Sequence, residues 1–556
     1  MNGDTARPNS TVPERIRQIK KALRGRAGKV LREEMARQVV QLLPVDHLVP
    51  EVYARWRPLV RDAMMFMVSR LSAARLAPKL VEQMDLALDT PPEVRLVRLI
   101  ANMPGLQKLG QVLSRNRHLD PALRDELSSL ENSIRDADAK QIRAIIAAEL
   151  AGRLETCKVE IEPRIFSEAT VSAVVRFTWR NPAAGRRERG VFKVLKPHIP
   201  ACFAEDMALL HELAEFLGSQ HREYGFAARV LPDTFEEVRR LLERELDFAR
   251  EQNTLEEAHQ LYSSLPGVRV PRLIRPLCTS KVTAITEERG EKVTDAAARM
   301  PEWRRSALAG ELIEALIAVP LLGPQEDAMF HADPHAGNLL YDESSGELVL
   351  LDWALTERLS REQRRRLAIL LVMLGLRDPV GVCTQIQALA QDGNLRQADV
   401  IREGVIRFLD DLPLAAPPGV VEAMRLVERL AREGVAFPAP LIMFRKVLFT
   451  LDGILHEIAG PSVSIDYVLG RHLIESWMGN PVNFGSPLSA ADWISVQWSV
   501  ALYGSRVWAQ WARTMLRPEP AGAEHGSKPL ERAARSQTYS NRRASMGSSC
   551  AAFRAG

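Results

Sequence analysis

The chain has 556 residues, of which 46% are apolar and 26% are charged, a composition close to that of an average soluble globular protein. This composition excludes a collagen-like, disulfide-scaffold or largely disordered chain, and the length predicts two or more domains. The five cysteines stand far apart, which predicts neither a zinc site nor a disulfide framework and favours a reducing compartment.

The net charge of +4 lies at the two ends of the chain. Residues 1–40 have a balance of +6 and residues 517–556 a balance of +4, which leaves −6 for the middle. A negative middle argues against a nucleic-acid-binding protein. The basic ends are either solvated or in contact with an anionic membrane.

Neither a signal peptide nor a transmembrane helix is predicted. The start of the chain is polar, and the longest uncharged apolar run, residues 367–376, is too short to span a bilayer. Residues 493–511 are apolar and rich in tryptophan but are interrupted by polar residues. This segment either packs on the core or lies in a membrane interface. We expect a cytoplasmic protein, soluble or peripheral at the inner face of a membrane.

The first 150 residues are predicted to be helical. Residues 13–43 read as one basic amphipathic helix. Residues 50–105 continue as helices broken at prolines, Pro78 among them, and a further helical stretch covers residues 106–150.

The pattern then changes to alternating residues rich in Val, Ile, Phe and Thr. In chain order, two strands are predicted within 159–179, and further strands are predicted at 190–195, 269–273 and 281–286. Two helices, roughly 201–222 and 231–262, lie between the third and fourth strands.

Helices predominate from residue 302 onward, apart from one hairpin of residues 339–341 and 348–351. Residues 517–556 are rich in Ala, Arg, Ser and Gly and are predicted to be disordered. Helices, then a small strand-rich lobe, then a large helical lobe is the layout of a protein kinase. We therefore predict an α+β fold, mostly helical, with two lobes of protein-kinase type and an N-terminal helical extension.

The strongest local motif is H-A-D-P-H-A-G-N at residues 331–338. Phosphoryl transfer from ATP needs one carboxylate to orient the acceptor, and an amide oxygen and a second carboxylate to hold magnesium. Asp333 and Asn338 have the spacing of a kinase catalytic loop, and Asp352 follows beyond the hairpin. The alternative is an ordinary turn rich in Asp, Pro, Gly and Asn. The hairpin and Asp352 favour the catalytic interpretation.

Lys193 lies in the apolar strand V-F-K-V at residues 191–194. A buried lysine needs a partner for its charge, and in kinases such a lysine contacts phosphates and pairs with a glutamate on a helix. The alternative is an edge-strand lysine whose ammonium reaches solvent. Asp247 and Glu251 share one face of a predicted helix, and charge alone does not choose between them.

These motifs together resemble the UbiB (AarF-domain-containing, ADCK) family of atypical kinase-like proteins over about half of the chain. K-L-G-Q at residues 108–111 is similar to the family's K-x-G-Q motif, which ordinary kinases lack. K-V-L-K-P at 193–197 resembles K-V-x-R-P, and E-L-D-F at 245–248 resembles the E-x-D motif. Glu251 matches the helix glutamate that pairs with the strand lysine, and Asp352 matches the metal-binding aspartate.

The resemblance implies a site for ATP and Mg²⁺. The implied catalytic residues are Asp333, Lys193 and Glu251. The implied magnesium ligands are Asn338 and Asp352. The implied nucleotide contacts are Lys193, Ala169, Thr170, Thr286 and Glu287.

The K-x-G-Q segment is implied to be regulatory. Lys108 and Gln111 would lie on helices that fold across the nucleotide site, with Lys108 paired with Glu245 or Asp247 of the E-x-D motif. This arrangement would obstruct a protein substrate, and it favours ATP hydrolysis or small-molecule phosphotransfer.

Three positions depart from the family pattern. Glu168 adds a negative charge to the nucleotide loop, which is unfavourable if it points toward the phosphates. Ala354 replaces the glycine of the usual Asp-Phe-Gly, and alanine does not readily adopt a positive φ. Thr286 stands where a hinge glutamate is expected, with Glu287 beside it.

The implied function is that of an atypical kinase or ATPase that supports isoprenoid lipid biosynthesis of the ubiquinone type, with a lipid or quinone precursor as ligand and a peripheral membrane contact. Glu168 and Ala354 support an alternative, a pseudokinase that acts as a nucleotide-gated binding or scaffold module. An antibiotic- or choline-type phosphotransferase is a third possibility, against which the K-L-G-Q motif argues. The phosphoryl acceptor and the oligomeric state stay open.

The resulting domain prediction has six parts. In chain order they are a basic helical extension (1–105), the K-x-G-Q segment (106–158), the strand-rich lobe with inserted helices (159–290), the helical lobe (291–480), a Trp-rich helix (481–516) and a disordered tail (517–556).

Overall fold

The structure of the chain is a computed structural model. It describes residues 11–471 apart from 102, 104, 108–119, 130–136, 170, 183, 225–238, 240–242, 245, 392–394, 414–417 and 461–462. Only the backbone is described at residues 25, 26, 128, 129, 395 and 396.

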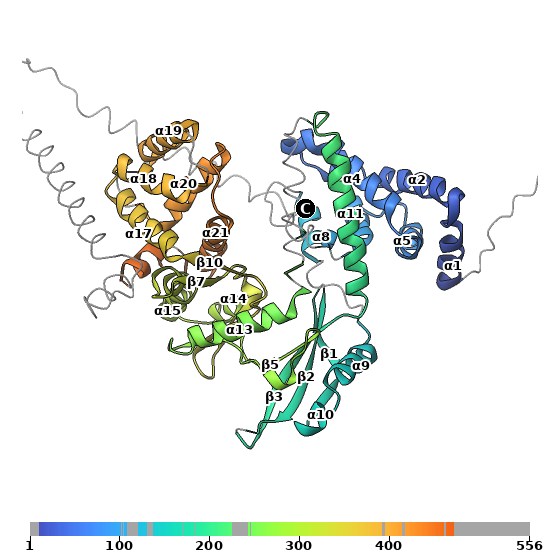
Figure 1. The fold of residues 1–556 in the computed structure, drawn as a ribbon, viewed down its shortest axis with the longest axis horizontal. Helices are drawn as coiled ribbons and strands as arrows, with labels where there is room; N and C mark the ends of the chain where they lie inside the picture. The colour runs from blue at the N-terminus through green and yellow to red at the C-terminus, as the bar shows by residue number, and fades with distance from the viewer. Residues whose placement is uncertain are drawn as a thin grey trace, which may run out of the picture. The chain divides into compact units, whose positions relative to one another are not determined.

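Short helices form the N-terminal region (Figure 1, blue). They are α1 (Val12–Ala22), α2 (Gly25–Gln41), α3 (Val45–Leu48), η1 (Glu51–Trp56), α4 (Arg57–Arg70), α5 (Ala73–Asp85), α6 (Pro92–Ile100) and α8 (Pro121–Ser129). Their apolar faces share one core with α11 (Ile199–Ser219), to which Leu209, Leu213 and Leu217 contribute. The rings of Phe66 on α4 and Phe216 on α11 stack with centroids 4.9 Å apart. The extension is therefore packed onto α11.

Two predictions for this region are wrong in detail. The single helix predicted over residues 13–43 is divided into α1 and α2 at the residues just before Gly25, and glycine is a poor helix former. Pro78 lies inside α5 and does not end it. Although a proline inside a helix costs about 3 kcal/mol, the neighbouring Leu76 and Leu80 are buried in the core, and their burial offsets that cost.

The strand-rich lobe contains a four-stranded antiparallel sheet. Its strands are β1 (Glu160–Glu168), β2 (Ser172–Arg180), β3 (Arg187–Leu195) and β5 (Val282–Thr286), in the order β1-β2-β3-β5. Helix α9 (Ala139–Leu150) buries Ile142 and Ile146 against the sheet, and the short α10 (Arg153–Thr156) follows it. Register places Lys193 on β3 opposite Val174 on β2 and Thr283 on β5.

Two inserted helices were predicted in this lobe. One is α11, and the other includes α13 (Phe248–Tyr262), while most of the remaining predicted range, 231–247, lies outside the described residues. Residues 225–238 lie outside the described part of the chain. Helix α13 packs against β5 and against β4 (Val268–Arg269), a short strand where the sequence predicted a longer one.

A second sheet contains strands from both of the predicted lobes. Its order is β4-β9-β8-β6, with β8 (Leu339–Asp342) and β9 (Glu347–Leu350) forming the predicted hairpin and β4 running parallel to β9. Strands β6 (Glu291–Lys292), β7 (Asp327–His331) and β10 (Thr356–Ser360) were not predicted, and β7 pairs with β10. Both are short, and β7 ends directly in the motif at residues 331–338.

The helical lobe follows. Its helices are α14 (Val293–Ala297), α15 (Glu302–Ile313), the π-helical turn η3 (Glu314–Ala318), α16 (Val319–Leu322), α17 (Arg361–Gly375), α18 (Pro379–Leu389), α19 (Leu395–Asp411), α20 (Val420–Arg432) and α21 (Ala439–Ala459), with the short turns η2 (Arg275–Leu277) and η4 (Ala336–Asn338). Helix α21 packs against α14, α15, α20 and β10, and it buries Phe444, Val447 and Leu451.

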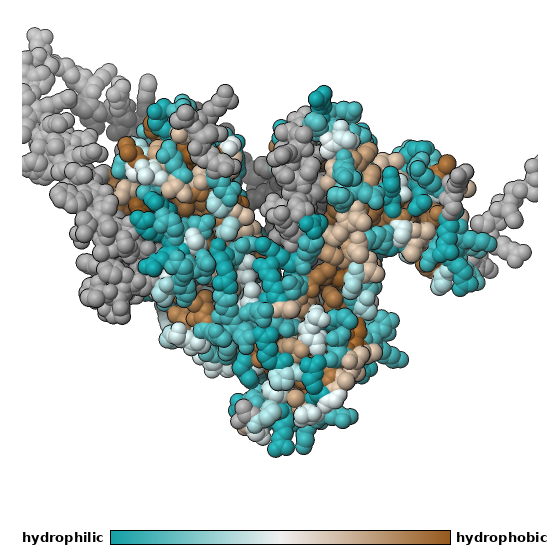
Figure 2. All heavy atoms as spheres, viewed as in Figure 1, coloured by the Kyte–Doolittle hydropathy of each residue, from teal (hydrophilic) through white to brown (hydrophobic). Residues whose placement is uncertain are grey.

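The predicted fold class is confirmed: the chain has a mostly helical α+β fold, with a small strand-rich lobe before a larger helical lobe. Over the described ranges, no helix is both long and apolar enough to cross a bilayer. Figure 2 shows hydrophilic residues over much of one face, with smaller hydrophobic areas among them. Large exposed apolar side chains such as Leu88, Trp303 and Tyr467 belong to separate parts of the chain.

Candidate active site

Lys193 forms the centre of an ion-pair network. Its Nζ lies 2.6 Å from Glu251 Oε1 on α13 and 3.8 Å from Asp352 Oδ1. The Glu251 side chain is only 9% exposed, so its charge needs the lysine that faces it. The structure thus brings together three of the residues that the sequence marked, from three distant segments.

Of the two carboxylates offered as partners for Lys193, the structure selects Glu251. Asp247 is exposed, and its Oδ1 accepts the N–H of Arg250 at 2.9 Å, which makes it the N-cap of α13. The next residue, buried Phe248, places its ring 5.7 Å from the Lys193 ammonium. Cap and aromatic ring together fix the start of the helix that presents Glu251.

The same helix contacts the segment that follows β9. Thr254 Oγ1 donates to the backbone oxygen of Trp353 at 2.9 Å. Trp353 is buried and lies edge-on to the ring of His331, with centroids 4.9 Å apart. Because Thr254 and Glu251 are one turn apart, α13 holds both Lys193 and the residue after Asp352. The sequence reasoning missed Thr254, which looks like an ordinary helix residue.

His331 organises the loop that carries Asp333. Its Nδ1 accepts the N–H of Asp333 at 3.2 Å, so the ring proton is on Nε2, which donates to the Leu351 oxygen at 2.9 Å. Burial lowers the pKa of His331 and keeps the ring neutral. In this neutral tautomer, the ring links the loop at Asp333 to Leu351, the residue before Asp352.

Asn338, the first of the two predicted magnesium ligands, is held by the loop that carries Asp333. Its Nδ2 donates to the backbone oxygen of Asp333 at 3.2 Å, which leaves Oδ1 as the atom able to bind a cation. Its backbone oxygen accepts the N–H of Leu351 at 2.8 Å, so Asp352 follows next to it. Magnesium is held by one or two carboxylates together with substrate phosphates rather than by an all-protein cage. Among the described residues, no group of three or more His, Cys, Asp or Glu side chains could hold a metal ion.

Asp352 takes the positive φ in this segment, at 53°, while Ala354 does not. Aspartate is among the few residues that tolerate this region. Asp352 Oδ1 also accepts the N–H of Ala354 at 3.3 Å, and the side chain is 47% exposed. The alanine that replaces glycine here is therefore compatible with the local backbone.

The nucleotide loop between β1 and β2 has a buried ion pair at its start. Glu168 Oε2 lies 3.1 Å from Lys196 Nζ, and it accepts the N–H of Ala137 at 3.1 Å. The Lys196 side chain is fully buried and that of Glu168 is 9% exposed. Ala169 closes the turn by donating its N–H to the Ser172 oxygen, and Thr170 lies outside the described residues.

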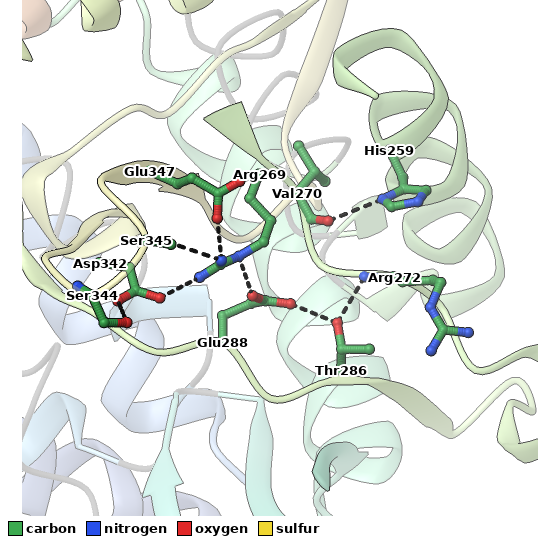
Figure 3. Close-up of polar contacts among 10 residues, drawn as sticks. All are labelled: His259, Arg269, Val270, Arg272, Thr286, Glu288, Asp342, Ser344, Ser345 and Glu347. Atoms are coloured by element: carbon green, nitrogen blue, oxygen red, sulfur yellow. Dashed lines mark hydrogen bonds and ion pairs between the residues drawn. The ribbon is translucent and has the colours of Figure 1, made fainter. Parts of the chain in front are cut away.

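The segment after β5 is tied to the hairpin that carries the site (Figure 3). Glu288 pairs with Arg269 Nε at 2.7 Å, and the same guanidinium binds Asp342 at 2.9 Å and Glu347 on the hairpin β8–β9. Thr286 Oγ1 donates to Glu288 and accepts the Arg272 N–H. The sequence reasoning missed Arg269, whose isolated charge in a short strand gives no signal.

Glu287 points its carboxylate at two arginines of the first sheet. The Arg176 and Arg189 guanidinium groups lie 2.7 and 2.5 Å from its oxygens. The Glu287 N–H donates to the Arg189 oxygen at 3.3 Å. Adenine contact by Thr286 and Glu287 stays a prediction.

Lys446 was not predicted and lies at the site. Its Nζ is 3.1 Å from Asp333 Oδ1, and it comes from α21. The only sequence signal is the charged pair Arg445–Lys446 within an otherwise apolar stretch of this helix.

The regulatory prediction falls mostly outside the described residues. Lys108, Gln111 and Glu245 are not described, so the pairing of Lys108 stays a prediction. The residue just before that segment is anchored: the N–H of Gly105 donates to Asp206 on α11 at 3.1 Å, and the same buried carboxylate binds Arg75 at 2.6 Å.

Comparison with known proteins finds similarity to one kinase-like family. A family model described as the ABC1 atypical kinase-like domain matches residues 129–385. "Probable protein kinase UbiB" of Haemophilus ducreyi is 29% identical over 414 residues, which are 71% of this chain and 73% of that protein. The protein of the same name from Actinobacillus pleuropneumoniae is 29% identical over 295 residues, 50% of this chain and 52% of the relative.

Two further matches are more distant. "Protein ACTIVITY OF BC1 COMPLEX KINASE 7, chloroplastic" of Arabidopsis thaliana is 26% identical over 360 residues, 63% of this chain and 50% of the relative. In two of these three relatives, the match therefore spans about half of the relative's length. A solved structure, the Rv3197–erythromycin complex from Mycobacterium tuberculosis, aligns with a TM-score of 0.43 at 14% identity over 66% of this chain and 89% of that one. The family resemblance read from the motifs is confirmed: residues 129–385 match the model of the ABC1 atypical kinase-like domain, and the chain is similar to proteins named "Probable protein kinase UbiB".

Proposed function

We propose that this protein binds Mg-ATP and acts as an ATPase or as a phosphotransferase toward a small-molecule or lipid acceptor. The observation that carries the proposal is the network of Lys193, Glu251 and Asp352 within ion-pair distance, beside the loop of Asp333 and Asn338. All five polar groups that kinase chemistry needs are present in this chain.

Each residue has a role in the proposed reaction. Lys193, held by Glu251, would bind the α- and β-phosphates. Asn338 Oδ1 and the half-exposed Asp352 carboxylate would hold Mg²⁺, a hard cation that prefers oxygen ligands. The bound ion supplies charge neutralisation for the phosphates. Asp333 would orient the acceptor hydroxyl or water and take its proton.

The acceptor class is proposed from the family resemblance. It implies an isoprenoid lipid or quinone precursor and a role in ubiquinone-type biosynthesis at the inner face of a membrane. The basic balance of residues 1–40 supports a contact with anionic headgroups. Helix α1 adds a local feature, because Lys20 and Lys21 lie in its last turn.

The pseudokinase alternative is now less supported. It relied on the negative charge that Glu168 adds to the predicted nucleotide loop and on Ala354 in place of a glycine that can adopt a positive φ. Glu168 is paired with Lys196 at 3.1 Å, and Ala354 has no positive φ. We therefore favour nucleotide turnover over a purely scaffolding role.

The proposal is tested by following the γ-phosphate of labelled ATP with the full-length protein. Reactions contain Mg²⁺, with or without anionic liposomes and a prenylated phenol as a model acceptor. We expect magnesium-dependent release of ADP, with label either in inorganic phosphate or in the lipid extract, and loss of both in Asp333→Asn. Label in a generic protein substrate alone would contradict the proposed acceptor class. Wild-type protein that binds no nucleotide would contradict the proposal as a whole.

A further inference from the structure

Lys446 lies beside Asp333 because of how α21 packs. The ring of Phe444 contacts the ring of Phe330 edge-on, with centroids 5.5 Å apart, and Phe330 directly precedes His331. Val447 and Leu448 are buried on the same helix. The core thus fixes the register of α21 against β7. Lys446 is carried to the catalytic loop by a segment 113 residues further along the chain and beyond the matched kinase-like domain.

The catalytic loop itself supplies no lysine or arginine. The residues between Asp333 and Asn338 are Pro, His, Ala and Gly. His335 Nε2 lies 4.0 Å from Asp333 Oδ2, whereas Lys446 Nζ lies 3.1 Å from Oδ1. Among the contacts described, Lys446 therefore supplies the permanent positive charge at the Asp333 carboxylate.

The two lysines of the site lie at different carboxylates. Lys193 faces Glu251 and Asp352, the residues assigned to the nucleotide and the metal, and Lys446 faces Asp333, the residue assigned to the acceptor. In phosphoryl transfer the acceptor oxygen, the γ-phosphorus and the leaving oxygen are in line, and negative charge spreads over the three equatorial oxygens. A cation at the acceptor carboxylate is within reach of those equatorial oxygens.

We propose that Lys446 is a further catalytic residue that contacts the γ-phosphoryl oxygens of bound ATP and stabilises them during transfer. The inference rests on the proposed function. In this step the bond between the γ-phosphorus and the β–γ bridging oxygen breaks, and a bond from the acceptor oxygen to phosphorus forms. The acceptor proton passes to Asp333 and ADP departs. Lys446 keeps its proton throughout. Its side chain is 35% exposed, so a ligand can reach it without opening the core.

The test compares Mg-ATP with Mg-ADP, because only ATP has the γ-phosphoryl group. In Lys446→Met, calorimetry should show Mg-ATP bound at least about tenfold more weakly, which is about 1.4 kcal/mol, while Mg-ADP affinity changes less than about twofold. Lys446→Arg should recover part of the loss, because guanidinium also binds phosphate. Lys281→Met is the matched control: Lys281 pairs with Glu149 at 3.0 Å on the surface, and its loss should alter neither affinity.

Several outcomes would overturn the inference. Equal weakening of ATP and ADP in Lys446→Met would assign Lys446 a structural role, and unchanged ATP affinity would remove the γ-phosphoryl contact. A loss of turnover with an unchanged ATP-to-ADP affinity ratio would make Lys446 a positioning residue for Asp333. If Lys446→Met does not fold, Lys446→Gln replaces it in the same comparison. Wild-type protein that binds neither nucleotide would refute the proposed function, whereas normal wild-type binding with a normal ratio in the variants would refute only the role of Lys446.

Discussion

The buried pair Glu168–Lys196 gives the most quantitative test of the strand-rich lobe. Lys196 stands next to Pro197 at the end of β3. Its side chain is fully buried, and its Nζ lies 3.1 Å from Glu168. Lys196→Met fills a similar volume but leaves Glu168, itself 9% exposed, without its lysine.

Removing one partner of a buried pair costs about 3–5 kcal/mol. Glu168 still accepts the N–H of Ala137 at 3.1 Å, so we expect the lower end, about 3 kcal/mol. A domain of 150–250 residues loses about 2–4 °C of Tm per kcal/mol, so the shift should be about 6–12 °C. The double variant Lys196→Met with Glu168→Gln leaves no buried charge and should be more stable than Lys196→Met alone.

The assay is thermal unfolding followed by calorimetry, with Lys281→Met as the control for loss of one lysine from the same lobe. The exposed Lys281–Glu149 pair should contribute at most about 1 kcal/mol. A Tm change in Lys196→Met no larger than that of Lys281→Met would refute the burial argument. So would a double variant less stable than Lys196→Met.

Three further predictions concern the site. Lys193→Met should weaken Mg-ATP binding more than about tenfold, because it removes both the proposed phosphate contact and the partner of a buried carboxylate. The affinity is measured by calorimetry. An effect as small as that expected for Lys281→Met would make Lys193 an ordinary strand lysine. Arg269→Met should lower the free energy of unfolding, measured with denaturant, by about 2 kcal/mol. This value is below the range for buried pairs because the guanidinium is partly exposed. A loss under about 0.5 kcal/mol would contradict the proposed link between the segment after β5 and the hairpin. Burial lowers the pKa of His331, so its contribution to stability is complete above the unfolded value of about 6.5 and falls by up to about 1.4 kcal/mol per pH unit below it. Unfolding measured between pH 7.5 and 5.5 should therefore be less pH-dependent in His331→Gln, and identical slopes would contradict this assignment.

The sequence pattern predicted those strands and turns whose formation depends mainly on neighbouring residues. The strands at 160–168, 172–180 and 282–286 follow from alternation, and the hairpin follows from its turn residues. Lys193 was recognised because a charge inside an apolar strand needs a partner. Its choice of Glu251 over Asp247 was not decidable from charge, since it depends on the N-cap that orients α13.

The rest depends on packing between distant segments. Lys446 looks like a solvated charge on a helix, and only the contact of Phe444 with Phe330 brings it to Asp333. Lys196 reads as a strand end beside proline, and its burial comes from Glu168 on another strand. Pro78 was predicted to break a helix. Helix α5 nevertheless continues through Pro78, because its apolar residues pack in a core that includes residues of α11.

Magnesium-dependent nucleotide binding is the central claim, and thermal stabilisation measures it most directly. A ligand at about 100 times its Kd stabilises the folded state by about 2.7 kcal/mol. The account predicts that ATP with Mg²⁺ raises the Tm of the full-length protein by several degrees, and that EDTA or Asp352→Asn removes most of the shift. Lys281→Met, which removes one lysine of a surface pair with Glu149, should leave the shift largely intact. The same shift in ATP with EDTA and in Asp352→Asn, or no shift in the wild type with Mg²⁺, would contradict the account.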